Sequence, residues 1–467
     1  MEKPQYQRLK TEQKALEINL NDSIYGTFSE IGAGQEVARI FFKVGAAAGS
    51  IAKTMSAYDK TYSDAIYGPE KSGRYVCESR LYNMLNHEWE LLEERLGNLR
   101  PETNFFVFAD TVTTINYSKT TKGQGWMGVR FQSSPGAPPN EMVIHVNMHD
   151  NDTRLQQDAI GILGVNLLYG CQTYRNDIKT LIASLMDSLE GRVTIDLIRF
   201  QGEGFEKVQK ELISLYMVAF GLTDVTIFDE EGVSIHASEF LYRQSLMVVR
   251  GNFKPPTLVT QDVIQCGFEQ FVEEKDVYAE KAHLLTEITL DYLKRKEGKI
   301  NIDDFLMRAT LLRSFGYKVL ISNHDNHQEL INYMSDFKIN HLGLVIGSRE
   351  LRDIIRDKYD NNQDGRLLVA LGELFNKNIK IYVYPGYDDQ AHEMTTANNI
   401  PIPDGMKYLY KHLLISQQIV EIEGYNPDIL AIYPKEVIQK IQSNDSSWES
   451  MVPDKVAEMI KEHNYFN

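Results

Sequence analysis

Cysteine is scarce in this chain of 467 residues, which contains only Cys77, Cys171 and Cys266. Because these residues lie far apart in the sequence, they predict neither a disulfide framework nor a Cys-x-x-Cys metal clip. We therefore expect reduced, buried thiols. A long apolar run is also missing. The longest uncharged stretch, residues 159–174, is shorter than the ~20 residues that a membrane-spanning helix needs.

The first ten residues contain no apolar segment and no small-residue cleavage site, so they do not resemble an export signal. We expect a soluble cytoplasmic protein without a membrane partner. Clusters of Lys and Arg are absent as well, and the formal net charge is −16 with a pI near 5.2. Because nucleic-acid-binding proteins use such clusters to neutralise phosphates, nucleic acid is an improbable partner.

The composition is that of a globular protein, with 43% hydrophobic and 24% charged residues. A chain of this length predicts two or three domains, at the usual ~100–200 residues each, unless one large α/β barrel occupies most of it. We divide it into residues 1–150, a glycine-rich helical segment plus a β-hairpin, residues 151–385, a barrel-like core, and residues 386–467, a helical extension.

The β-hairpin is predicted from two alternating runs, residues 126–131 and 141–148, which a turn-rich stretch with three prolines separates. Before it, residues 11–100 have a largely helical pattern. Between residues 80 and 96, Leu81, Leu85 and Leu92 recur on one helical face, which is typical of a core stripe.

Beyond residue 193 the pattern becomes a repeat of strand and helix, and several strand segments are near-continuous apolar runs. Parallel strands buried on both faces have this pattern. The runs are residues 193–200, 224–228, 246–251, 283–290, 318–322, 342–347 and 379–384. The fold class is therefore α/β. A (β/α)₈-like barrel is our first expectation, and an open, doubly wound, mostly parallel sheet is the alternative.

The strongest candidate site is a glycine-rich turn at Gly32 and Gly34, followed by Gln35 and Glu36 at the start of a predicted helix. Backbone N–H groups at a helix start suit an anion or phosphate, so these four residues are candidate ligand-binding residues. A purely structural turn is the alternative. The dinucleotide-binding fingerprint is incomplete, because Val37 stands at its third glycine position.

Two further candidates follow in the sequence. The small-residue stretch 47–54 ends in Lys-Thr but lacks the glycines of a phosphate-binding loop. Lys53 could therefore act only as a single cation beside an anion. An ordinary surface lysine is the alternative. Asp59 is a candidate proton carrier. No metal site is assigned, and no cofactor can be named.

In a barrel, functional residues gather at the carboxyl ends of the strands. Arg250, Asn252, Glu287 and Asn323 occupy such positions. We expect Arg250, Asn252 and Asn323 to bind the ligand and Glu287 to move protons. A structural ion pair between Arg250 and Glu287 is the alternative.

A second possibility is the sequence His324-Asp325-Asn326-His327, which follows the run 318–322 and could present two histidines to a phosphate or a metal. A surface loop is the alternative, because no third ligand can be assigned.

Several segments resemble an uncharacterised bacterial family. They are Ile-Gly-Ala-Gly-Gln-Glu-Val-Ala-Arg at residues 31–39, Ala-Lys-Thr-Met-Ser-Ala-Tyr-Asp at 52–59, Ser-Asp-Ala-Ile-Tyr-Gly at 63–68, Gly-Ile-Leu-Gly-Val-Asn-Leu at 161–167 and Val-Arg-Gly-Asn-Phe at 249–253. Members of that family are often labelled TonB-dependent receptor or nicotinate-nucleotide adenylyltransferase. The receptor label implies an exported outer-membrane β-barrel, which conflicts with the alternation of strands and helices.

The sequence thus favours an enzyme of unassigned reaction that binds a phosphate-bearing small molecule, with a nucleotide as one candidate. It leaves open whether the protein is catalytic. A non-catalytic scaffold, in which a Gly/Ala-rich helix packs against another subunit of a homo-oligomer, is the alternative. A nucleotidyltransferase is a weaker one, because its phosphate site would need glycine where Asn326 stands.

Overall fold

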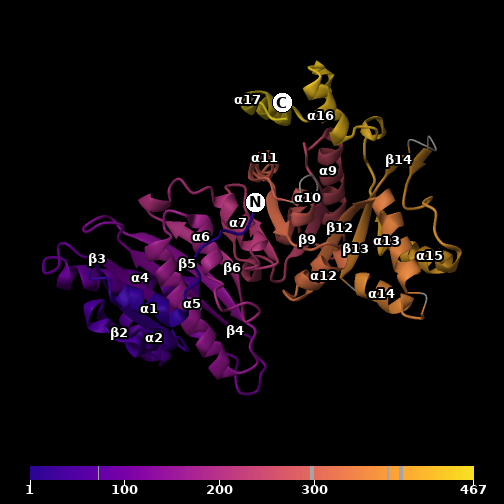
Figure 1. The fold of residues 1–467 in the computed structure, drawn as a ribbon. Helices are drawn as coiled ribbons and strands as arrows, with labels where there is room; N and C mark the ends of the chain where they lie inside the picture. Colours follow the sequence, from indigo (N-terminus) through magenta and orange to yellow (C-terminus); the bar gives the residue numbers. More distant parts are fainter. Residues whose placement is uncertain (72, 295–298, 363, 376–377, 389–392, 467) are drawn as a thin grey trace. The chain divides into compact units, whose positions relative to one another are not determined.

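The structure is a computed structural model that describes residues 1–71, 73–294, 299–362, 364–375, 378–388 and 393–466 (Figure 1). Its contacts divide the chain into an N-terminal unit, residues 2–226, and a C-terminal unit, residues 227–467 with Met1. The expected boundaries after residues 150 and 385 fall inside these units, so the three-part division stays a prediction. The expected extension 386–467 includes residues 389–392 and 467, which lie outside the described residues.

The N-terminal unit contains a six-stranded sheet with the order β2-β1-β3-β4-β5-β6. Strand β1 is parallel to β2 and β3, and the remaining neighbours are antiparallel. The strands are β1 (Ile24–Gly32), β2 (Ile51–Ala57), β3 (Asn104–Thr113), β4 (Gly123–Phe131), β5 (Asn140–Met148) and β6 (Val193–Gln201). The predicted hairpin is confirmed as β4 and β5, whereas the run 193–200 pairs with β5 in this sheet.

The expectation of a helical N-terminal segment is wrong in part, because β1 and β2 interrupt it. The helices of this unit are α1 (Thr11–Asn19), α2 (Glu36–Val44), α3 (Lys60–Tyr67), α4 (Glu78–Leu96), α5 (Thr153–Thr173), α6 (Ile178–Ser184) and α7 (Lys210–Ala219), with short 3₁₀ turns η1 (Ala47–Gly49) and η2 (Glu203–Phe205). Strand β1 contains β-branched and aromatic residues that are buried on both faces of the sheet, and such residues favour a strand over a helix.

Helices α1, α2 and α5 contact one another, and α4 contacts β1, β3 and β4. The predicted stripe of α4 lies in a core cluster, where Leu81, Met84 and Leu85 are fully buried. At the other interface, Gly164 of α5 allows close packing, since a Cβ there would lie 2.5 Å from the Val37 side chain of α2.

The C-terminal unit contains an eight-stranded sheet with the order β16-β13-β12-β9-β10-β11-β7-β8. The strands are β7 (Val225–Phe228), which spans the boundary between the units, β8 (Ser234–Ile235), β9 (Ser245–Arg250), β10 (Ala282–Thr289), β11 (Lys318–Ser322), β12 (His341–Gly347), β13 (Ile379–Tyr384) and β16 (Ile419–Glu421). From β11 to β16 all neighbours are parallel, whereas β7 and β8 are antiparallel. The other runs predicted beyond residue 200 all correspond to strands of this sheet.

The barrel expectation is wrong: in the described residues both sheets are open. The physical reason is the direction of chain growth. After β9, the next two strands add on one side of it, and then β12, β13 and β16 add on its other side. Growth in both directions leaves two separated edges, and it gives the six parallel strands the 3-2-1-4-5-6 order of doubly wound sheets. The order reverses between β9 and β12.

Helices connect these strands, as parallel pairing requires, and two further helices follow the last strand, β16. They are α8 (Ala237–Phe240), α9 (Leu258–Val272), α10 (Leu290–Lys294), α11 (Ile302–Arg313), α12 (His327–Ser335), α13 (Ser348–Asn361), α14 (Leu367–Leu374), α15 (Lys407–Ile415), α16 (Pro434–Gln442) and α17 (Asp454–His463). Short elements are η3 (Ala279–Lys281), η4 (Asp404–Met406), η5 (Pro427–Ile429), η6 (Ser446–Met451) and the hairpin β14 (Gly386–Asp388) and β15 (Glu393–Thr395). Residues of α16, η6 and α17 form a core cluster with α11.

Among the described residues, no helix combines the length and apolarity needed to cross a bilayer. All three cysteines are free thiols, and Cys171 is buried.

Candidate functional site

The glycine-rich turn packs tightly against strand β3 of its own unit. Gly32 has a φ of +80°, and a Cβ at this residue would lie 2.2 Å from the Val112 carbonyl oxygen of β3. A Cβ at Gly34 would lie 1.9 Å from Oδ1 of Asp110. Both glycines are therefore required for packing against β3. Their predicted role in ligand binding stays a prediction.

Two buried carboxyl groups lie beside this turn. Glu30 of β1 and Asp110 of β3 are partners in the strand register, and their exposed fractions are only 2% and 0%. The Ala38 N–H of α2 donates to Glu30 Oε1 at 3.2 Å, whereas the Asp110 carboxyl has no side-chain hydrogen-bond partner among the described residues. Burial, followed by repulsion between the two groups, raises the pKa of Asp110 well above its usual range. Burial raises the pKa of Glu30 to about 8.

Gln35 and Glu36 bind within their own segment. Gln35 Nε2 donates to the Gly32 carbonyl at 2.5 Å and to Ser56 Oγ at 3.1 Å. Glu36 accepts from Arg39 Nε at 2.8 and 2.9 Å and from Arg39 Nη2 at 2.5 Å. These contacts stabilise the turn.

Lys53 and Asp59 have separate partners. Lys53 Nζ donates to Glu88 of α4. Asp59 is the N-cap of α3, where its Oδ1 accepts the Tyr62 N–H at 2.8 Å. An N-cap carboxylate already has a structural role, and no further side-chain partner of Asp59 is found among the described residues.

In the C-terminal unit, Arg250 and Glu287 form a buried bidentate ion pair with distances of 2.8 and 2.9 Å. Their side chains are 6% and 0% exposed. Glu287 Oε1 also accepts the Ser322 hydroxyl at 2.5 Å. The ion-pair alternative for these two residues is therefore confirmed. Because both Glu287 oxygens are occupied, the structure offers no additional support for its predicted proton-transfer role.

Among the described residues, no hydrogen bond joins this pair to the other two residues predicted at the strand ends, Asn252 and Asn323. The carbonyl of Asn252 accepts from Arg308 at 3.0 Å. Asn323 is exposed after β11, and it lines neither of the two cavities at this sheet edge.

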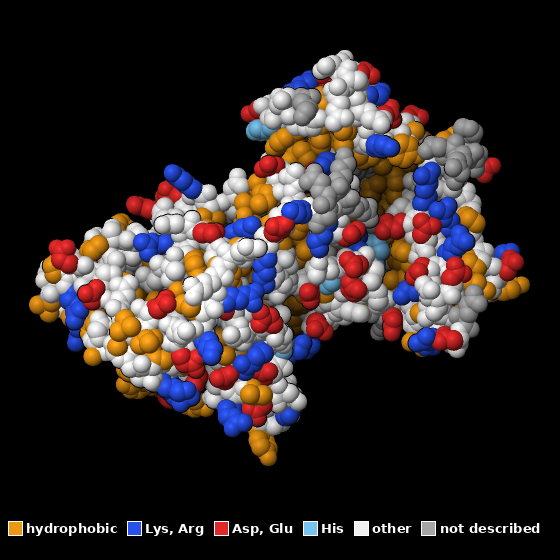
Figure 2. Space-filling view, in the orientation of Figure 1, with side chains coloured by type: hydrophobic (Ala, Val, Ile, Leu, Met, Phe, Trp, Pro, Cys, Tyr) orange, Lys and Arg blue, Asp and Glu red, His pale blue; other side chains and the backbone are white. Residues whose placement is uncertain are grey.

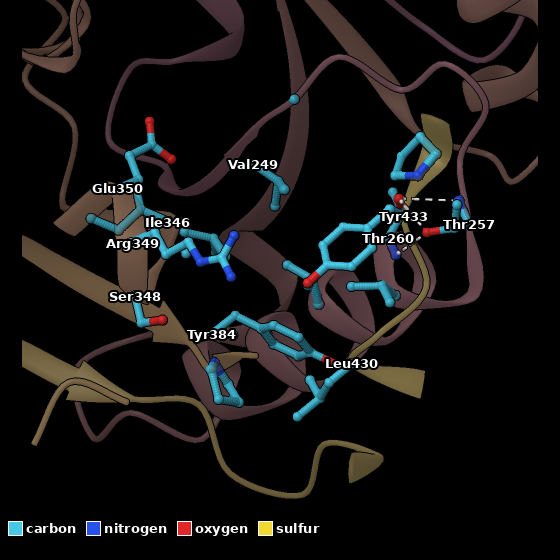
Figure 3. Close-up of a pocket in the computed structure, with 18 of the residues that line it drawn as sticks. Val249, Thr257, Thr260, Ile346, Ser348, Arg349, Glu350, Tyr384, Leu430 and Tyr433 are labelled. Carbon is cyan, nitrogen blue, oxygen red and sulfur yellow. Dashed lines mark hydrogen bonds between the residues drawn. The ribbon is translucent and has the colours of Figure 1, made fainter. Parts of the chain in front are cut away.

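A cavity of about 350 Å³ opens at the carboxyl ends of β9, β12 and β13. It therefore lies beside the position where the strand order reverses, which is where open α/β sheets bind their ligands. Its lining is mainly apolar and aromatic and includes Val249, Ile346, Tyr384, Leu430 and Tyr433 (Figure 3).

Polar groups enter this cavity from the start of α13. Helix α13 begins directly after β12, and its N-cap residue Gly347 provides no side-chain cap. The first-turn residues Ser348, Arg349 and Glu350 line the cavity. In Figure 3 the Arg349 guanidinium points into the cavity toward the Tyr433 ring. Both side chains donate to the Tyr387 carbonyl, Tyr433 at 3.3 Å.

A second cavity, of about 840 Å³, shares Arg250 and Glu350 with the first. In Figure 3 the Glu350 side chain points away from Arg349, and its Oε1 lies 3.0 Å from Nε2 of His327, which lines the second cavity. His327 is 8% exposed. Around this cavity Asp and Glu side chains gather over α12 and α13 (Figure 2). His324 instead packs against Tyr333, with ring centroids 5.9 Å apart.

Neither a family model nor a curated protein matches the chain. Solved structures with partial similarity include a competence/damage-inducible protein, CihA, from Agrobacterium tumefaciens, with 14% identity and a TM-score of 0.26 over 34% of this chain and 93% of that one. A CinA superfamily protein from Klebsiella pneumoniae has 10% identity and a TM-score of 0.27 over 36% and 99%. One from Escherichia coli has 12% identity and a TM-score of 0.24 over 38% and 88%. Similarity at this level carries no inference about function.

The sequence analysis identified Arg250 and Asn252 of the first cavity but missed Arg349, Tyr384 and Tyr433. One signal was available for Arg349, because Ser348-Arg349-Glu350 directly follows the predicted strand 342–347 and begins a helix. Tyr433 had no such signal, since it comes from a loop far along the chain.

Proposed function

We propose that the C-terminal unit binds a phosphate-bearing small molecule, a nucleotide in the leading case, in the cavity at the carboxyl ends of β9 and β12, and that it acts on this molecule as an enzyme. The observation that carries the proposal is the position of the uncapped α13 N-terminus and Arg349 in a cavity at the reversal of strand order. The anion is thereby assigned to α13 instead of the glycine-rich turn.

Two features favour a phosphate group at the start of α13. The first-turn N–H groups of a helix lack intrahelical acceptors and carry the positive end of the helix dipole. Arg349 is exposed, and its donation to Tyr387 uses only one of the five N–H donors of a guanidinium. The remaining donors can pair with phosphate oxygens in a bidentate manner.

The aromatic and apolar lining favours a planar group attached to that phosphate. Tyr384 and Tyr433 present their rings to the cavity (Figure 3). Their hydroxyls are fixed, since Tyr384 donates to Asp262 at 2.6 Å and Tyr433 to the Tyr387 carbonyl at 3.3 Å. Rings held in this way can stack on a base without a large loss of side-chain entropy.

His327, which lines the neighbouring second cavity, is the candidate acid–base residue. Its Nε2 is paired with Glu350, which fixes the ring, whereas its Nδ1 is buried without a hydrogen bond in the described residues. A histidine oriented by a carboxylate is a common general acid or base. His327 also gives the weaker alternative, a nucleotidyltransferase, its one supporting observation.

Calorimetric titration of the full-length chain with AMP, ribose 5-phosphate and inorganic phosphate tests the proposal. Arg349→Gln should weaken AMP binding at least about tenfold, the effect of losing one charge-assisted contact. Arg356→Gln, on an exposed turn of the same helix, is the matched control and should bind as the wild type does. Tyr433→Leu should weaken AMP more than ribose 5-phosphate. Equal binding by the two arginine variants would refute the assignment.

The scaffold alternative has less support from the structure. The small residues 45–50 form a loop with the 3₁₀ turn η1 and not the expected helix. Gly161 and Gly164 of α5 pack against α2 within the same unit. A homo-oligomer, and a cytoplasmic location, stay predictions.

A further inference from the structure

The N-terminal unit contains a third cavity, of about 340 Å³, between the edge of its sheet and α4. Thr27 of β1 and Ala52 and Lys53 of β2 line it on the sheet side. Strand β2 is the edge strand, so no further strand of the described sheet covers this end of α4. We propose that this cavity binds a small monocarboxylate with an aliphatic chain.

The cavity wall on α4 is a regular stripe along the helix. Glu88, Leu91, Leu92, Arg95 and Leu96 line the cavity, at the spacing i, i+3, i+4, i+7 and i+8 of one helical face. The same face nearer the N-terminus of α4 fills the core with Leu81 and Leu85. The leucines that border the cavity therefore offer an aliphatic chain a continuous apolar surface.

At the polar end of the cavity, the Lys53 ammonium is held in a fixed position. Glu88 is only 1% exposed, and it is satisfied by Lys53 and by the Tyr67 hydroxyl at 2.8 Å. Tyr67 is in turn hydrogen-bonded to the buried Ser29 hydroxyl at 2.6 Å. This buried network fixes Glu88, and Glu88 fixes the position of the Lys53 ammonium.

Lys53 retains the capacity to bind an anion. An ammonium has three N–H donors, and among the described residues Lys53 donates to Glu88 alone. Its side chain is 38% exposed. Arg95 is also exposed, and no ion pair with it is found in the described residues. Two cations against one carboxylate give the lining a net positive charge, in a chain of net charge −16.

Charge and shape together select the ligand class. A carboxylate can accept the remaining Lys53 donors and be attracted by Arg95, and its aliphatic chain can cover Leu91, Leu92 and Leu96. An ammonium compound would be repelled by both cations, because Glu88 is already paired. A neutral alcohol would gain only the apolar contact.

Ligand-detected NMR and calorimetry on the full-length chain, with octanoate, octylamine, 1-octanol and acetate as probes, test the proposal. Octanoate should bind at least about tenfold more tightly than 1-octanol, the factor expected for one charge-assisted contact. Acetate should bind more weakly than octanoate, and octylamine should not bind. Equal binding of octanoate and octanol, or no binding of octanoate, would overturn the proposal.

Variants locate the binding. Lys53→Met combined with Glu88→Gln removes the cation without leaving a buried unpaired charge, and it should reduce octanoate affinity about tenfold. Because Arg95 is exposed, Arg95→Met should leave the fold intact. It should reduce the octanoate affinity by a smaller factor. Lys43→Met, which removes an exposed lysine of α2, is the matched net-charge control for Arg95→Met, and the double variant leaves the net charge unchanged. Unchanged octanoate affinity in both cavity variants would place the binding elsewhere and refute the proposal.

Discussion

The two units use a glycine between a strand and a helix in opposite ways. In the N-terminal unit, Gly32 ends β1 and Gly34 lies two residues later, and no side chain fits at either because the backbone of β3 and Asp110 fill the space. In the C-terminal unit, Gly347 ends β12 with a φ of −76°, and a Cβ there would meet nothing within 4 Å. Similar strand–glycine–helix sequences thus produce a closed turn in one unit and an open cavity in the other.

The two units also differ in the partners of their buried acidic residues. In the C-terminal unit the buried Glu287 is neutralised by Arg250. In the N-terminal unit Asp110 is buried beside another acid, Glu30, and no cation pairs with either in the described residues. A buried charge is tolerated when a cation pairs with it, whereas an unpaired buried acid is tolerated in its protonated form.

Removing one partner of the buried ion pair should cause the largest loss of stability. Arg250→Met leaves Glu287 buried without its cation, and we expect a loss of about 3–5 kcal/mol in the stability of the C-terminal unit. Arg250→Met combined with Glu287→Leu should recover most of it. Urea unfolding followed by the fluorescence of Trp448, in a background with Trp89→Phe and Trp126→Phe, reports this unit. A single variant as stable as the wild type would contradict the paired-charge interpretation.

Replacing the two glycines by alanine should give the second-largest difference in stability. Gly34→Ala should destabilise the N-terminal unit by about 3 kcal/mol, because its Cβ would overlap Asp110. Gly347→Ala is the matched control, and it should change the stability of the C-terminal unit by less than about 1 kcal/mol. Fluorescence of Trp89 and Trp126, in a Trp448→Phe background, follows the first unit. Equal costs for the two substitutions would remove the contrast.

The smallest expected effect is on the pH dependence of the N-terminal unit. The pKa of Glu30 is about 8 in the folded protein, against an ordinary value of 4.5. Between these values the folded state binds more protons than the unfolded state, so its free energy of unfolding should fall as the pH rises from about 4.5 to 8. Asp110→Asn should weaken this dependence, because it removes a second buried acid whose pKa is raised by burial and by repulsion from Glu30. Urea titrations at several pH values measure it, and an unchanged slope in Asp110→Asn would contradict the coupling.

By itself, the sequence determined the α/β class, the hairpin β4–β5 and most strands of the C-terminal sheet. It could do so because apolar alternation and apolar runs are local consequences of burial. It could also suggest the ion pair of Arg250 and Glu287, since both stand at the ends of predicted strands.

Only the tertiary structure decided the order of those strands, because their direction of addition to the sheet depends on contacts between distant segments. The tertiary structure places Val193–Gln201 in the first sheet and has an open sheet in place of the expected barrel. It also brings Tyr433 beside Arg349. It also gave Gly34 and Gly347 their different surroundings, since the space available at a glycine is determined by whichever strand or helix packs against it.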